Sequence, residues 1–237
     1  MNRLTRDGHL LQTFARLADT LVDDYDVVEL LQILVDTCRD VLEMTAAGIH
    51  LADPQGELDV VASTSESGPF VEMMQLNADA GPCGESYRSG RRISAEDLEN
   101  APASWERFTM SALAQGYRAI DALPLRLRDT SIGTLSLLRS SAGEAPTDDI
   151  VAAQAFADVA TIGILHERAM RESAILSEQL QIALNSRIVI EQAKGVVSQT
   201  RGVPIDEAFT LMREYARAHQ MRLSLVAAQL VERRINL

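Results

Sequence analysis

The side chains with the most specialised chemistry in this sequence are two cysteines, four histidines and one lysine. Cys38 and Cys83 are too few for a disulfide framework and the histidines are scattered, so we expect no metal site and no bound cofactor. Of the 22 basic residues, 21 are arginines and Lys194 is the only lysine. P-loop proteins, protein kinases and Schiff-base enzymes each need a lysine in a defined place. Residues 1–172 contain no lysine, which excludes those classes there.

Cys83 follows a Gly-Pro pair, and Pro82 suits the first turn of a helix. A helix N-terminus stabilises a thiolate, so Cys83 is a candidate redox thiol. The competing interpretation is a small buried side chain, which is the more frequent role of an unpaired cysteine. No set of Cys, His and Asp residues shows a catalytic spacing, and we predict no catalytic residue.

Charge is distributed unevenly along the chain. The overall net charge is −12. Residues 1–172 hold 14 arginines against 28 acidic residues, whereas residues 173–237 hold 8 basic against 6 acidic residues. An acidic body and a mildly basic tail indicate two modules, of which only the second suits a polyanion.

The first module alternates helical periodicity with pairs of strands. The expected helices cover 10–22, 27–42, 69–76 and 105–115, and the expected strands cover 47–52, 58–62, 119–127 and 132–139, with a short extended piece from Ile93. Asp26 has the position of a helix cap, and Asp53-Pro54-Gln55-Gly56 is typical of a turn. Two hairpins predict an antiparallel sheet packed with helices, which is the α+β class.

A single helix of more than fifty residues is expected between Thr147 and Gly202. Apolar residues recur seven apart along it, at Ile162, Ala169, Leu176, Ala183, Ile190 and Val197. A seven-residue apolar repeat favours a coiled-coil dimer. The alternative is burial against the helix's own module, although the charged residues between 167 and 172 argue against that. Two shorter helices follow, Ile205–His219 and one capped by Ser224, so that three helices surround a small core over 173–237.

The tail resembles the ANTAR family of RNA-binding transcription antiterminators. Over some sixty residues the carriers of the resemblance are Ala183-Leu184-Asn185-Ser186-Arg187, Ile190-Glu191-Gln192-Ala193-Lys194-Gly195-Val196, Asp206-Glu207-Ala208-Phe209, Met212-Arg213 with Ala216, and Leu223 with Val226-Ala227. Pro204 departs from the Ser or Thr helix cap expected there. The resemblance implies binding to paired stem-loops in nascent RNA, which prevents a terminator hairpin from forming.

Residues 10–170 resemble the GAF sensory domains that precede ANTAR domains in actinobacterial regulators. The resemblance rests on Gly81-Pro82-Cys83 with Glu85, Trp105-Glu106-Arg107-Phe108, Leu123-Pro124-Leu125 and Ile132-Gly133-Thr134-Leu135. It implies a small-molecule pocket between sheet and helices, lined by Cys83, Trp105, Phe108 and Tyr117. The alternative, a filled core without a ligand, stays open. The predicted domains are therefore a GAF-like sensory domain over 10–170 and an ANTAR domain over 173–237.

The candidate RNA-binding residues share two helical faces. On an ideal helix Arg187, Glu191, Lys194 and Ser198 fall within a stripe about 60° wide, and Arg213 and Arg217 lie one turn apart on the next helix. Such arrays contact phosphates and exposed loop bases, and the alternative is a solvated surface. Phe209 and Tyr215 are predicted to be core residues, so charge and hydrogen bonds should dominate the contacts.

The sequence therefore predicts a homodimeric, cytoplasmic, non-enzymatic regulator. Its GAF domain would sense a signal, its ANTAR helices would bind paired stem-loops in nascent RNA, and no membrane would be involved, because no apolar run or signal peptide is evident. The alternative is a GAF-type thiol enzyme that uses Cys83, as the free methionine sulfoxide reductases do.

Overall fold

A computed structural model describes residues 8, 10, 12, 14, 15, 26–42 and 44–237. The chain divides into two compact units, Met1–Glu167 and Arg168–Leu237. The helix predicted over 10–22 falls mostly outside the described residues, and those described within it (10, 12, 14 and 15) are helical.

The first unit is built on a five-stranded antiparallel sheet with the order β2-β1-β5-β4-β3. The strands are β1 (Ala46–Ala52), β2 (Leu58–Ser63), β3 (Ile93–Ala95), β4 (Ala119–Leu127) and β5 (Thr130–Arg139). Asp53 forms the β1–β2 turn, where its carboxylate accepts hydrogen bonds from the backbone N–H groups of Gln55 and Glu57 at 2.8 and 2.9 Å. Both predicted hairpins and the α+β class are confirmed.

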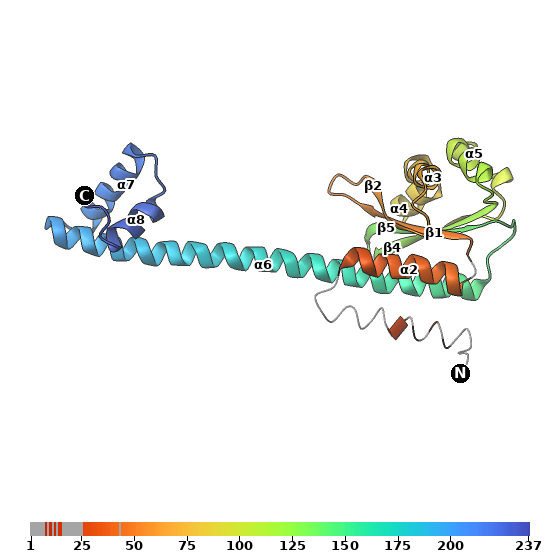
Figure 1. Ribbon diagram of the computed structural model, residues 1–237, viewed down its shortest axis with the longest axis horizontal. Coiled ribbons are helices and arrows are strands. Elements are labelled where there is room, and N and C mark those ends of the chain that lie inside the picture. The colour runs from red at the N-terminus through yellow and green to blue at the C-terminus, as the bar shows by residue number, and fades with distance from the viewer. Residues whose placement is uncertain (1–7, 9, 11, 13, 16–25, 43) are drawn as a thin grey trace. The chain divides into compact units, whose positions relative to one another are not determined.

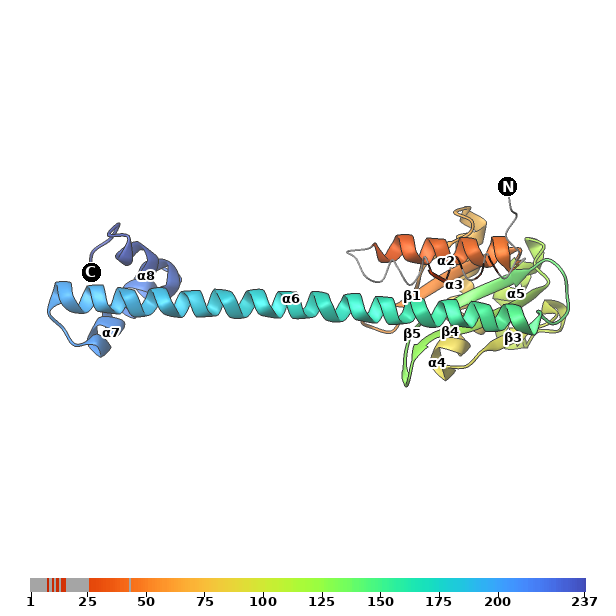
Figure 2. The same cartoon turned by 90° about the horizontal axis from the view of Figure 1, so that it is seen from below.

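One face of the sheet is covered by α2 (Val27–Val41) and the beginning of α6 (Thr147–Arg201) (Figures 1 and 2). The Asp26 carboxylate accepts a hydrogen bond from the Val28 N–H at 2.8 Å, which confirms the predicted cap. Leu30, Leu31, Leu34 and Val35 of α2 are fully buried. Each such side chain contributes about 1.5–3 kcal/mol by leaving water, so this layer holds the helix on the sheet.

The opposite face carries α3 (Gly68–Ala80), α4 (Pro82–Ser89) and α5 (Glu106–Ala114) (Figure 1). Short 3₁₀ turns, η1 (Leu98–Asn100) and η2 (Ala103–Trp105), precede α5. The helix predicted over 69–76 extends to Ala80 and ends at Gly81. A Cβ atom at Gly81 would come within 2.8 Å of the Asn77 backbone, so only glycine permits this tight passage into α4.

The long helix α6 runs without a break from Thr147 to Arg201, 55 residues, which confirms the predicted connecting helix. Ala153, Phe156, Ala157 and Ile164 belong to the buried cluster of the first unit. One stretch of α6 is long and apolar enough to cross a membrane by length and composition, and half of it is buried within the structure. The expectation that the chain has no apolar stretch of membrane-spanning length is therefore wrong. The burial of this stretch is that of a helix packed on a sheet.

The second unit consists of the end of α6, α7 (Ile205–Ala218) and α8 (Leu223–Val231) (Figure 2). Ala193, Val197, Met212, Val226 and Leu230 are among the residues of its buried core. The predicted three-helix arrangement is confirmed. Helix α8 begins at Leu223 with Arg222 in the cap position, so the prediction that Ser224 caps it is wrong.

Candidate functional site

Lys194 lies on α6 beside the second helix of its unit. Its ammonium group is 3.0 and 2.8 Å from the two carboxylate oxygens of Glu191, one turn earlier. The same nitrogen lies 5.6 Å from the centre of the Phe209 ring on α7. The side chain of Lys194 is 16% exposed, so its stem is sheltered while its charge reaches the surface.

Arg213 approaches the same aromatic ring from α7. The central carbon of its guanidinium is 5.8 Å from the centre of the Phe209 ring, within the range of a cation–π contact. The structure therefore brings Lys194 and Arg213, nineteen positions apart in the sequence, to one aromatic side chain. We call Lys194, Phe209 and Arg213 the aromatic–cation cluster.

The prediction that Phe209 is a core residue is wrong. Its side chain is partly exposed, and it does not belong to the buried apolar cluster of residues 168–237, a stretch that the structure describes completely. Tyr215 does pack against that cluster, as predicted. The spacing of four between Phe209 and Arg213 was the available sequence signal, because residues four apart are neighbours on a helix surface.

The other predicted RNA-binding residues have different surroundings. The Ser198 hydroxyl donates to the backbone oxygen of Val203 at 2.6 Å, so it holds the turn between α6 and α7. Arg187 and Arg217 are exposed. Arg217 lies one turn beyond Arg213, whereas Arg187 lies about 10 Å from Lys194 along the helix axis at 1.5 Å per residue.

Cys83, in the first turn of α4, belongs to a buried polar group between that helix and the sheet. Its sulfur is 2.6 Å from the Ser136 hydroxyl of β5, and its backbone N–H donates to the Asn77 side-chain oxygen at 2.9 Å. The Asn77 amide also donates to Ser136 at 3.1 Å. Burial raises the pKa of the Cys83 thiol to about 11, so the thiol is protonated near neutral pH.

His50 of β1 extends this polar group. It pairs across the sheet with Thr134, and both side chains are fully buried. The His50 Nε2 lies 3.0 Å from the Met74 carbonyl and Nδ1 has no hydrogen-bond partner among the described residues. Burial lowers the pKa of His50 to about 4, which keeps the ring neutral.

The remaining predicted pocket residues pack in an apolar cluster on the same face of the sheet. Trp105 and Phe108 are buried within it, and Tyr117 packs at its margin, with its ring 6.1 Å from that of Phe70. The indole N–H of Trp105 donates to a Glu85 carboxylate oxygen at 2.7 Å, which links this cluster to the helix that carries Cys83.

Comparison with known families assigns both units. Residues 24–165 match the GAF domain and residues 178–231 match the ANTAR domain. The chain belongs to the GAF domain family. Its C-terminal ANTAR domain is an RNA-binding domain of antitermination regulators, and the GAF domain is a sensory module. No curated protein matches the chain.

Solved structures agree on the fold of the GAF domain. The GAF domain of a phosphoenolpyruvate-protein phosphotransferase from Coxiella burnetii is 16% identical, with a TM-score of 0.56, covering 69% of this chain and 97% of that one. The corresponding Acinetobacter domain is 17% identical, with a TM-score of 0.53, covering 67% and 94%. Free methionine-R-sulfoxide reductase from Neisseria meningitidis is also 17% identical, with a TM-score of 0.54, covering 70% and 91%. At these identities the similarity concerns the fold alone.

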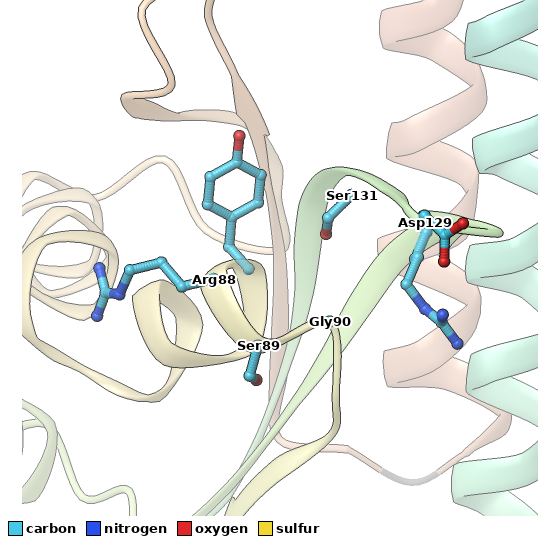
Figure 3. Close-up of a pocket in the computed structure, with 7 residues that line it drawn as sticks. Arg88, Ser89, Gly90, Asp129 and Ser131 are labelled. Atoms are coloured by element: carbon cyan, nitrogen blue, oxygen red, sulfur yellow. The ribbon is translucent and has the colours of Figure 1, made fainter.

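A cavity of about 410 Å³ lies at the other end of α4 in the GAF domain (Figure 3). It is lined by Tyr87, Arg88, Ser89, Gly90, Arg126, Asp129 and Ser131. None of the four predicted pocket residues is among them. The Arg126 guanidinium donates to the Arg128 carbonyl at 2.7 Å, and Arg88 points away from the β4–β5 hairpin in Figure 3. The two guanidinium groups therefore do not converge on a common ligand position.

Proposed function

We propose that this protein is a homodimeric regulator whose ANTAR domain binds paired stem-loops in nascent RNA and prevents terminator formation, under control of a signal sensed by the GAF domain. The observation that carries the proposal is the aromatic–cation cluster. It places two cations from different helices, the half-buried Lys194 and the exposed Arg213, against one partly exposed ring in a domain whose family binds RNA. Fixed cations of this kind suit the phosphates of a folded RNA loop.

The candidate RNA-binding residues have distinct roles in this proposal. Lys194 and Arg213 contact the RNA directly from the cluster. Arg217 and Arg187, both exposed, extend the basic surface along their helices. Ser198 supports the site indirectly, because its hydrogen bond to Val203 fixes the turn that sets α7 against α6.

Exposed apolar side chains on α6 support the homodimer. Between Met170 and Ile188 the exposed large apolar residues are Met170, Ile175, Leu176, Leu180, Ile182, Leu184 and Ile188. Apolar side chains concentrated in this way mark an interaction surface. Their partner is a second copy of the same helix, because the seven-residue repeat through Leu176 and Ala183 matches itself. The prediction that this row continues through Ile190 and Val197 is wrong, because both pack in the core of the second unit.

The proposed domain limits are 10–170 for the GAF domain and 173–237 for the ANTAR domain. Both family matches fall within these limits, and the compact units divide between Glu167 and Arg168. We also propose that the protein is cytoplasmic and acts without a membrane, since the apolar stretch of α6 is half buried in the fold.

The GAF signal is proposed to be a small molecule bound near Cys83, Trp105, Phe108 and Tyr117. A polar group of the ligand would complete the hydrogen bonding of the buried polar group beside them, where no described residue is a hydrogen-bond partner of the His50 Nδ1. A buried polar atom without a hydrogen-bond partner costs about 1–3 kcal/mol of stability. A ligand or a water molecule that hydrogen-bonds to the His50 Nδ1 therefore stabilises this buried polar group.

The thiol-enzyme alternative is not favoured by the surroundings of the cysteines. The raised pKa of Cys83 keeps it from acting as a thiolate near neutral pH. Cys38 belongs to the core on the opposite face of the sheet from α4, and burial raises its pKa to about 12. Cys38, the one other cysteine of the sequence, therefore does not lie beside Cys83 and is not placed to act as a second, resolving thiol.

RNA binding by the full-length protein tests the proposal. A pool of two-hairpin RNAs with randomised loops is enriched against the wild type, and one enriched RNA is labelled for anisotropy titration. The double variant Lys194→Ala/Arg213→Ala should bind about 100-fold more weakly or worse, because it loses two charge-assisted contacts of about 1.5–3 kcal/mol each. Arg107→Ala, an exposed arginine of α5, is the matched control and should bind as the wild type does. Failure of the wild type to enrich any RNA would contradict the proposal.

A further inference from the structure

Phe209 occupies an unusual position for a large apolar side chain. It lies on α7 between a buried neighbour, Ala208, and solvent, and two cationic groups approach its ring within 6 Å. Of the five phenylalanines in the chain, Phe70, Phe108 and Phe156 are buried in the first unit. Phe209 instead remains partly exposed next to the charges that the RNA proposal uses.

The stability of α7 does not account for the partly exposed position of Phe209. The α7 side chains that fill the core are Ala208, Met212 and Ala216, which share one face at spacings of four. A partly exposed Phe adds less to stability than a buried one, because hydrophobic stabilisation scales with the apolar area removed from water. A phenyl ring kept at the surface between cations is suited to a ligand that combines a planar apolar face with negative charge.

We propose that Phe209 is a stacking platform for an unpaired nucleobase of the RNA loop, with Lys194 and Arg213 binding the phosphates on either side of that base. This inference rests on the proposed RNA-binding function and adds to it a residue that recognises the base. Unpaired loop bases stack on aromatic side chains, and each base has a planar face to offer. A nucleotide joins such a base to a phosphate, which matches an aromatic ring with cations around it.

Glu191 gives the cluster its balance of charge. Its carboxylate holds Lys194 in the free protein, so the cluster and Glu191 together carry two cations and one anion. The Glu191 side chain is 57% exposed, so solvent screens its attraction to the Lys194 ammonium. A phosphate can therefore compete for the Lys194 ammonium at small cost while the base stacks on Phe209.

Leucine in place of Phe209 separates stacking from charge. Phe209→Leu keeps an apolar side chain but removes the ring, and it should weaken binding of the enriched RNA by about 5- to 100-fold, the range for loss of one stacked base. The slope of log affinity against log salt should not change, because no phosphate contact is lost. Lys194→Ala, in contrast, should reduce that slope by about one.

The outcomes separate this inference from the proposed function. If the wild type binds RNA and Lys194→Ala weakens it while Phe209→Leu binds as the wild type does, the stacking role is overturned and the RNA function stands. If the wild type binds no RNA, the proposed function itself fails. Thermal melts of each variant show whether a loss of RNA binding is accompanied by a loss of stability.

Tryptophan at the same position keeps the test valid if Phe209→Leu does not fold. Phe209→Trp retains an aromatic platform and should bind within about threefold of the wild type. The natural chain has a single tryptophan, Trp105 in the GAF domain, so the added emission is obtained by difference. Stacking of a base should quench this emission on addition of RNA. Unchanged emission at saturating RNA would overturn the proposal.

Discussion

At the scale of single residues, a buried neutral histidine should make the GAF domain sensitive to acid. The folded pKa of His50 is about 4 against an ordinary value of 6.5, so the contribution of the neutral ring to stability is fully present above pH 6.5 and is lost as pH falls toward 4. One proton bound on unfolding over this range corresponds to about 2 kcal/mol at pH 5. Urea unfolding at pH 7.5 and pH 5 measures this loss.

The control for His50 is a residue of similar shape that does not titrate. His50→Asn should be less stable than the wild type at pH 7.5, but it should lose less stability than the wild type between pH 7.5 and 5. The other titratable groups are the same in both proteins, so the difference between the two losses of stability isolates the contribution of His50. Identical losses in the two proteins would mean that the ring is solvated or already charged in the folded state.

At the scale of elements, the sequence predicts the hairpins, α2 and the long α6, because each depends on local chemistry. Asp26 and Asp53 hydrogen-bond to backbone N–H groups within four residues, and such contacts follow from residue type and spacing. The end of α3 is different, since Gly81 is constrained by close packing on Asn77, which spacing does not reveal. The start of α8 at Leu223 likewise follows from packing of that helix and not from a cap by Ser224.

The features of the candidate site also differ in whether the sequence could predict them. The helical stripe with Lys194 and the pair Arg213 and Arg217 could be read from periodicity. Their meeting at Phe209 could not, because it depends on how α7 packs against α6. The polar layer of His50, Cys83 and Ser136 also required the sheet register, which places residues distant in sequence opposite one another.

The exposed side of α6 leads to a prediction about assembly. Leu176→Glu places a charge in the apolar row, and a charge at a closed interface costs several kcal/mol when unpaired. The variant should therefore sediment as a monomer at micromolar concentration, whereas the wild type sediments as a dimer. Gln181→Glu adds the same charge on the side of the helix opposite the row through Leu176 and Ala183, so it should leave the dimer intact. A monomeric wild type would contradict the proposed interface.

At the scale of the whole molecule, two ANTAR domains joined in a dimer should favour RNA with two hairpins. The ANTAR half is only weakly basic, with 8 basic against 6 acidic residues, so a single domain should bind one loop weakly. Once one loop is bound, the second loop binds at an effective concentration set by the linkage, and the combined affinity can rise by about 10²–10⁴. Anisotropy titrations of the full-length protein should therefore show at least about tenfold tighter binding to a two-hairpin RNA than to either hairpin alone. The preference should disappear in Leu176→Glu while its affinity for a single hairpin stays the same, since the aromatic–cation cluster is untouched. A wild-type protein that binds one hairpin as tightly as two would mean that the dimer does not present its two RNA surfaces to the same transcript.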